Sequence, residues 1–177
     1  INHYESSPSS SIQIFTVNLR GRWKLGDVSV QYLYLQAYGD TEGAEFLPVD
    51  NFNLRPEWGR LVQDRRHRLQ LVGTAQLPRG FRLGLISSLS SGRPFDITTG
   101  ADDNGDTEVN DRPAGMRRNS GHGPSFAKLD VRLGKEWVFN RIDGRKLRLE
   151  TVAEAFNVFN HVNLGNFVGN RSSPFFG

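Results

Sequence analysis

The sequence predicts an all-β fold, an antiparallel up-and-down meander of about six strands that forms part of a transmembrane β-barrel. Three observations predict it. In several segments apolar residues occupy every second position, as in a strand with one apolar and one polar face. Short turns alternate with long polar loops, which is the asymmetry of outer-membrane barrels. No stretch approaches the roughly 18 consecutive apolar residues of a membrane helix.

The first predicted hairpin contains the clearest alternation. In the strand near 12–25, one face carries Phe15, Val17, Leu19, Gly21, Trp23 and Leu25. A tight turn at Gly26 and Asp27 leads into a returning strand near 28–38. The polar stretch 39–64 is longer than the usual connection in a compact domain, which predicts a long outer loop.

Two further hairpins follow the same plan. Strands near 66–77 and 81–90 flank the turn Pro78-Arg79-Gly80, and strands near 126–137 and 146–156 flank a turn through Asp143 and Gly144. Residues 91–124 and 157–177 are predicted as long outer loops. We therefore interpret residues 1–177 as one partial barrel, because a β-sandwich has no reason to alternate short and long connections.

Composition narrows the possible functions. The chain has no cysteine, which excludes disulfide scaffolds and thiol catalysis. The net charge is +3, but Lys and Arg are spread along the strands, so we do not expect nucleic acid as a partner. No Gly-x-Ser-x-Gly elbow or phosphate-cradling loop is present, and we do not expect an enzyme. The start at Ile1 without a signal peptide predicts a mature piece or a fragment.

Four short motifs occur in order from Asp64 onward. They are Asp64-Arg65-Arg66-His67-Arg68, Ser91-Gly92-Arg93-Pro94-Phe95, the loop pair Asp102-Asp103-Asn104-Gly105-Asp106 and Asn110-Asp111-Arg112-Pro113, and the run Glu154-Ala155-Phe156-Asn157-Val158-Phe159-Asn160 with Asn163. In these motifs the chain resembles the C-terminal barrel region of TonB-dependent outer-membrane receptors, of the type with a carboxypeptidase-regulatory-like N-terminal domain. Residues 1–63 are similar only in general style.

The resemblance implies a segment of a receptor in the bacterial outer membrane that takes up or binds an unknown solute. It implies as partners the outer-membrane lipid, the remaining barrel strands and a plug domain of the parent chain. An inner-membrane energy-coupling protein would act through the missing N-terminal part. A closing strand with a terminal aromatic residue is expected after the last loop, whereas the sequence stops at Phe175-Phe176-Gly177. Transporters of this architecture use about 22 strands, so about six cannot close alone.

The loop 91–124 contains a candidate calcium site. Its oxygen-bearing side chains are Asp102, Asn104, Asp106, Asn110 and Asp111, and hard cations prefer such ligands. The spacing departs from an EF-hand, which wants Gly and Glu where Thr107 and Pro113 stand. Alternatively, Arg93, Arg112, Arg117 and Arg118 could pair with these carboxylates and order the loop without Ca²⁺.

The polar strand face carries the candidate ligand contacts. Arg68, Arg82, Lys128 and Arg132 would line the lumen of the barrel with positive charge and favour anionic solutes. Two alternatives from other classes stay open at this point. One is a secreted, calcium-stabilised β-sheet interaction module, and the other is a barrel lipase whose serine and histidine would meet on the lipid face.

Overall fold

Six long strands dominate the structure, a computed structural model that describes residues 8–43, 46–140 and 144–177. These strands are β1 (Ser10–Trp23), β2 (Gly26–Gly39), β4 (His67–Leu77), β5 (Phe81–Ser90), β8 (Phe126–Asn140) and β9 (Lys146–Ala155). The short strands are β3 (Gly59–Arg60), β6 (Pro94–Phe95) and β7 (Gly121–His122), and the short 3₁₀ turns are η1 (Arg55–Glu57) and η2 (Pro78–Gly80). Within the described ranges, no helix is long and apolar enough to cross a membrane.

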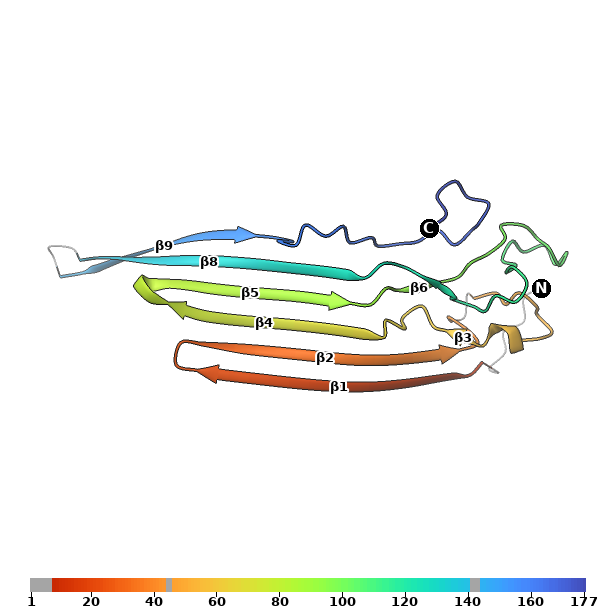
Figure 1. Cartoon of the computed structure of the whole chain (residues 1–177), viewed down its shortest axis with the longest axis horizontal. Helices are drawn as coiled ribbons and strands as arrows, with labels where there is room; N and C mark the ends of the chain where they lie inside the picture. Colours follow the sequence, from red (N-terminus) through yellow and green to blue (C-terminus); the bar gives the residue numbers. More distant parts are fainter. Residues whose placement is uncertain (1–7, 44–45, 141–143) are drawn as a thin grey trace.

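The long strands form one antiparallel sheet in the order β1-β2-β4-β5-β8-β9 (Figure 1). Each long strand therefore lies beside its neighbour in sequence, which confirms the predicted all-β antiparallel meander. The sheet is open, with β1 and β9 as its two outer strands. Short turns connect the strands at one end of the sheet, and the long loops gather at the other end (Figure 1). We call these the hairpin end and the loop end.

The first hairpin turns two residues earlier than the sequence predicts. Trp23 pairs with Gly26, so β1 ends at Trp23 and the turn is Lys24-Leu25. Gly26 belongs to β2, where it pairs with Trp23 and Ala75, and a Cβ atom there would collide with the backbone oxygen of Thr74 on β4. The glycine serves close packing between strands here, where sequence reasoning assigns it to a turn. The predicted loops also contain structure, with η1 and β3 in 39–64 and β6 and β7 in 91–124.

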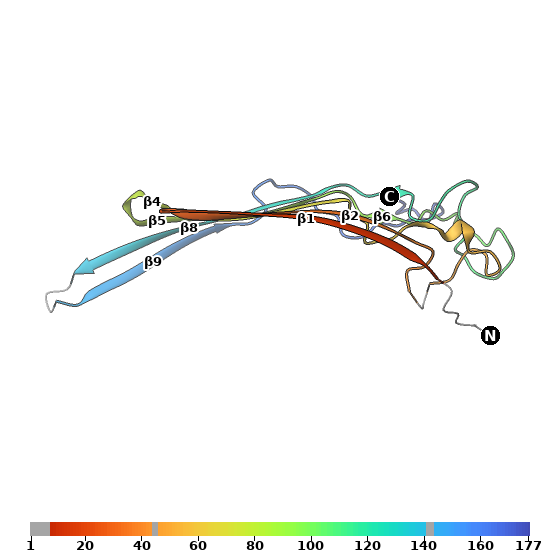
Figure 2. The ribbon, with the colours of Figure 1, turned by 90° about the horizontal axis from the view of Figure 1, so that it is seen from below.

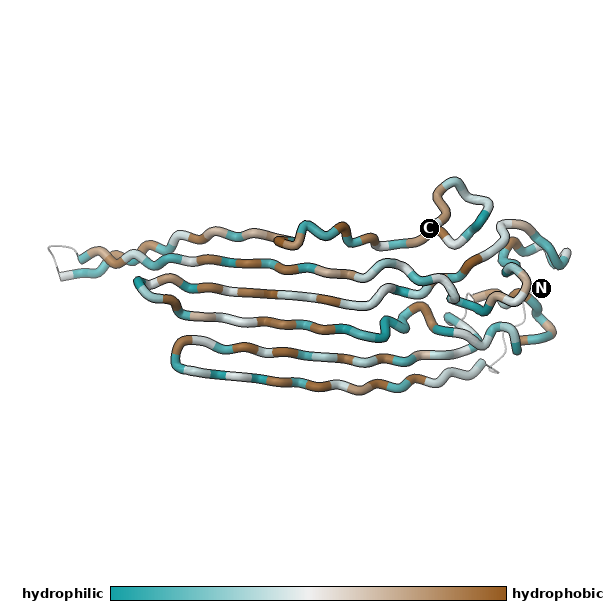
Figure 3. The backbone as a smooth tube through the Cα atoms, viewed as in Figure 1, coloured by the Kyte–Doolittle hydropathy of each residue, from teal (hydrophilic) through white to brown (hydrophobic). Residues whose placement is uncertain are grey.

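The register separates two faces across all six strands. One row runs through Gly21, Val28, Gly73, Leu85, Val131 and Ala155. The neighbouring row along the strands, on the other face, contains Arg20, Ser29, Val72, Ile86 and Asp130. Directly paired residues of a sheet point to the same side, so we call the first side the apolar face and the second the polar face. The alternation of hydropathy along each strand is visible in Figure 3.

The sheet is a single layer, and viewed edge-on it shows no second layer over most of its length (Figure 2). Among the described residues the buried apolar core consists of Leu35, Ala37 and Leu61. Large apolar side chains such as Phe15, Leu19 and Leu149 are more than half exposed. Folded soluble domains bury such surface between two layers, and this sheet leaves it uncovered.

Candidate functional site

The four predicted lumen residues all lie on the polar face. The register places Arg68 beside Ser90, Arg82 beside Gly134, and Lys128 and Arg132 on β8. Three of them pair with a carboxylate on the same face. Arg82 lies 3.3 Å from Glu136, Lys128 lies 2.7 Å from Asp130, and Arg132 lies 3.1 Å from Glu154.

These pairs change what the polar face can do. Each of these three cations has a neighbouring anion, so this part of the face carries both signs, whereas the sequence predicts a positive lining. Glu136 also lies 3.4 Å from Arg148 of β9, which links β5, β8 and β9. Arg68 differs, because its Nη2 atom donates to the backbone oxygen of Gln63 and its buried Nε atom has no hydrogen-bond partner. Arg68 is thus the one of the four that bonds to the backbone and not to a carboxylate within the described ranges.

The acidic loop holds itself together through its own backbone. The Asp102 carboxylate accepts N–H groups from Gly105, Asp106 and Thr107 at 2.7 to 3.0 Å. The Asp111 carboxylate, which is buried, accepts those of Asp103 and Asn104 at 2.6 and 3.1 Å. Positive φ angles at Gly105 and Thr107 let the chain wrap around these oxygens.

The other predicted calcium ligands anchor the acidic loop to residues 47–49. Asn104 donates its side-chain amide to the oxygen of Val49 at 2.7 Å, and Asn110 donates to Leu47 and Pro48 at 3.2 Å. The Asp106 carboxylate accepts the N–H of Glu108. The five residues thus lie in one loop, and most of their polar atoms bond to backbone groups, whereas the buried Oδ1 atom of Asn110 has no hydrogen-bond partner within the described ranges. Within the described part of the chain, no group of three or more His, Asp or Glu residues is placed to hold a metal ion.

A buried ion pair joins the two loops that the sequence leaves separate. Arg112 donates Nη1 and Nη2 to the two oxygens of Glu57, each at 2.9 Å, and its Nε lies 2.8 Å from Asp96 Oδ2. Glu57 is fully buried and also accepts the N–H of Val49. Burial alone would lower the pKa of Arg112, but the bonds to Glu57 and the charge of Asp96 outweigh it and raise that pKa. Arg112 therefore stays protonated inside the loop end.

A second buried arginine lies next to this pair. Arg118 donates to the carbonyl oxygen of Gly39, lies over the Phe46 ring at 4.9 Å and is 3.8 Å from Glu42. Burial lowers the pKa of Arg118, and the charges of Glu42 and Glu57 oppose that shift. Of the four arginines predicted to pair with the acidic loop, Arg112 and Arg118 pair instead with acids outside it. Sequence reasoning missed Glu57 and Glu42, although the motif Asn110-Asp111-Arg112-Pro113 marked the right arginine.

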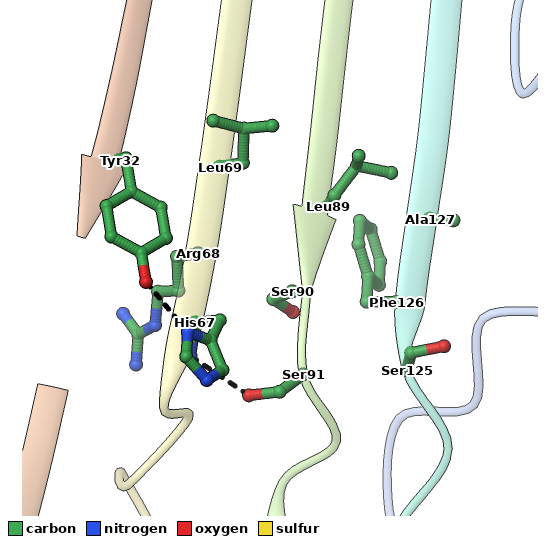
Figure 4. Close-up of a pocket in the computed structure, with 10 residues that line it drawn as sticks. All are labelled: Tyr32, His67, Arg68, Leu69, Leu89, Ser90, Ser91, Ser125, Phe126 and Ala127. Atoms are coloured by element: carbon green, nitrogen blue, oxygen red, sulfur yellow. Dashed lines mark hydrogen bonds between the residues drawn. The ribbon is translucent and has the colours of Figure 1, made fainter. Parts of the chain in front are cut away.

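Two adjoining hollows lie at the loop end, and they share His67 and Ser91. The first, of about 360 Å³, is lined largely by Tyr32, Leu69, Leu89, Phe126 and Ala127 (Figure 4). The second, of about 450 Å³, is lined by Arg60, Arg66, His67, Ser91, Gly92, His122 and Gly123. We call them the apolar hollow and the cationic hollow.

His67 is fixed at the junction of the two hollows. Its Nδ1 atom lies 2.8 Å from the Tyr32 hydroxyl, and its backbone N–H donates to Ser91 Oγ at 3.1 Å (Figure 4). Tyr34, its direct neighbour on β2, has its ring centroid 5.5 Å from the imidazole. The aromatic group that results lies at the boundary between apolar and charged side chains.

Compared with known proteins, the chain matches no family model, no curated protein and no solved structure.

Proposed function

We propose that the chain is a segment of an outer-membrane receptor barrel of the TonB-dependent type, acting in uptake or surface binding of a solute. The observation that carries the proposal is the continuous apolar face of a single-layer sheet. Its rows extend through all six strands and have no protein packed on them over most of their length. Lipid is the solvent that would cover such a face while the polar face lines an aqueous interior.

The dimensions of the strands support a membrane setting. β5 has 10 residues, which span about 33 Å at 3.3 Å per residue. A tilt of about 40° relative to the barrel axis reduces this to about 25 Å, the height of the apolar band of outer-membrane barrels. β5 therefore fits a membrane crossing with little excess, whereas β1, β2 and β8, with 14, 14 and 15 residues, extend beyond the apolar band.

Aromatic residues lie near both ends of the apolar face. Trp23, Phe81, Trp137 and Phe139 are at the hairpin end, and Phe15, Tyr32 and Tyr34 are at the loop end. Lys135 lies over the rings of Phe81 and Trp137, at 4.7 and 5.2 Å from their centroids. Aromatic rings and snorkelling lysines favour the two membrane interfaces. This distribution supports a lipid-facing role for the whole face.

The open edges of the sheet support a larger barrel. β1 and β9 each have one neighbour in the sheet, and a transmembrane sheet must satisfy every edge N–H and C=O group by closing on further strands. In the proposed receptor these strands belong to the parent chain, together with a plug domain. The long loops would then lie outside the cell and the short hairpins inside it. The ordered motifs from Asp64 to Asn163 support the TonB-dependent type.

Cysteine labelling in cells would test the proposal. The chain has no cysteine, so single substitutions within it give site-specific signals. We expect Leu71→Cys and Leu85→Cys, on the apolar face, to resist a water-soluble maleimide in intact outer membranes and to react after detergent extraction. Gln70→Cys, on the polar face, is the matched control and should react with a small reagent that enters the barrel. Full reaction of all three sites in intact membranes would exclude a lipid-facing surface.

A further inference from the structure

The apolar and cationic hollows open on the same side of the sheet. Leu69 and His67 are alternate residues of β4 on the apolar face, paired with Tyr32 and Tyr34. Tyr38 is on that face of β2 as well, and it pairs with Arg60 of β3. Moving along this face towards the loops, one passes from leucine through tyrosine and histidine to arginine. The two hollows are therefore successive parts of one surface.

The cationic hollow holds more positive than negative charge. Asp64, fully buried beneath it, accepts the Arg60 Nε at 2.8 Å, and Arg66 Nε lies 3.4 Å from the same carboxylate. Arg66 also donates Nη2 to the Tyr38 hydroxyl at 2.7 Å. Two guanidinium groups thus share one carboxylate, which leaves them a net positive charge and fixes their orientation.

Neighbouring arginines add to this charge. Burial lowers the pKa of Arg65, and the charges of Arg68 and Arg93 lower it further. Arg60 Nη1 lies 3.0 Å from His122 Nδ1, so the imidazole lies against a cation. Crowded cations of this kind create a local potential that attracts anions.

We propose that the joined hollows bind one phosphate-bearing membrane lipid, with its phosphate in the cationic hollow and an acyl chain along the apolar hollow. This inference rests on the proposed membrane location. Guanidinium groups match phosphate oxygens in planar, bidentate geometry. The leucine and tyrosine side chains of the apolar hollow offer the adjacent surface that an acyl chain would cover. A soluble phosphate would use only half of this surface.

The position relative to the membrane favours a lipid. Tyr32 and Tyr34 mark the proposed interface at the loop end, where lipid headgroups lie. Arg60 is beside Tyr38. Tyr38 is four residues beyond Tyr34 on β2, or about 13 Å at 3.3 Å per residue. The cations therefore lie on the headgroup side of these tyrosines, whereas Leu69 and Leu89 lie level with Tyr32, where the acyl chains would begin.

The test uses the protein that carries this chain, purified into nanodiscs. One set of nanodiscs contains phosphatidylcholine alone, and in the other set one fifth of the lipid is fluorescent phosphatidic acid. A probe at the loop end of the protein quenches this fluorescence when the lipid binds nearby. We expect phosphatidic acid to be enriched at the protein. The double variant Arg66→Gln/His122→Gln should weaken this binding about tenfold for each charge-assisted bond lost. These two residues are chosen because Arg60 remains to pair with buried Asp64.

Two control variants make the result specific. Arg79→Gln removes one charge at the hairpin end, in η2, and should leave phosphatidic acid binding unchanged. Ala127→Leu fills the apolar hollow and should weaken binding of the lipid. It should not change the affinity of the cationic hollow for inorganic phosphate, measured by competition with the lipid. Both variants preserve Arg66 and His122, so loss of binding in the double variant can be assigned to the cationic hollow.

The outcomes separate this inference from the proposed function. Failure of the protein to insert into any nanodisc would contradict the membrane proposal itself. Insertion without enrichment of phosphatidic acid, or with equal enrichment in the double variant, would overturn the lipid site alone. Complete displacement of the lipid by millimolar inorganic phosphate, with no effect of Ala127→Leu, would show a soluble-anion site and overturn the lipid assignment.

Discussion

Arg112 and Glu57 form a buried, two-bond ion pair that fastens one long loop to the other. Both bonds measure 2.9 Å, and Arg112 continues to Asp96 through Nε. The two residues are separated by 55 positions in sequence, so the pair closes a large loop. Because Glu57 is fully buried, Arg112 takes the place of solvent around its carboxylate.

Loss of Arg112 should therefore open the loop end. We expect Arg112→Met to destabilise the local structure by about 3–5 kcal/mol, since it leaves a buried carboxylate without its counter-ion. Amide exchange at Val49 and Asn119 would measure the effect, because these N–H groups donate to Glu57 and Asp96. The double variant Arg112→Met/Glu57→Leu should recover most of the loss, read at Asn119 because Val49 loses its acceptor together with Glu57. Arg82→Met is the matched control, whose exposed pair with Glu136 should contribute under about 1 kcal/mol.

The direction in which the strands face lipid can be tested with one substitution on each face. Leu85 on the apolar face lies between Gly73 and Val131, and Gln70 on the polar face lies between Gln31 and Ser88. Leu85→Arg should reduce stability in the membrane by about 2–4 kcal/mol, the cost of a lipid-facing arginine near the midplane. Gln70→Arg should have little effect. Urea unfolding in lipid vesicles would measure both, and equal tolerance would contradict the assigned facing.

The sheet could be predicted from the sequence because each strand is recognisable from residues that are adjacent in the sequence. Period-2 alternation specifies a strand and its two faces together, so five of the six long strands could be placed within about two residues at both ends. The largest difference is in β8, which continues to Asn140 where the sequence suggested an end near Trp137. Trp137, Val138 and Phe139 form a continuous apolar run that interrupts the alternation, and Val138 and Phe139 pair with Arg148 and Leu147.

The loop end could not be predicted because its contacts are between residues distant in sequence. Nothing in the spacing of Glu57, Asp96 and Arg112 indicates that they meet. The same holds for the cationic hollow, where Arg60 reaches His122 across 62 positions. The four predicted cations share one face of the sheet, but their spacing in the sequence does not indicate that three of them have carboxylate partners.

Asn163 extends the sheet beyond the end of β9 by imitating a strand partner. Its side-chain amide donates to the Ala127 oxygen and accepts the Ala127 N–H, both at 2.9 Å. Asn163→Ala should cost about 1–3 kcal/mol, since two backbone groups of β8 lose their partner. Asn163→Asp keeps the acceptor but loses the donor, so its effect should be intermediate. Exchange of the Ala127 amide would rank the three proteins, and identical rates would contradict this role.

The acidic loop should keep its structure without calcium, because Asp102 already accepts the N–H groups of Gly105, Asp106 and Thr107. We expect a chelator to leave amide exchange at these three residues unchanged, whereas Asp102→Ala should accelerate it about tenfold, at the lower end of the range for bonds to a charged group. Asp50→Ala, which removes a cap from Phe52 outside the loop, controls for charge. Slower exchange and a higher melting temperature on addition of Ca²⁺, both abolished by Asp106→Ala, would contradict the expectation. That result would favour a calcium-stabilised module, because the metal would then supply order that the backbone bonds do not.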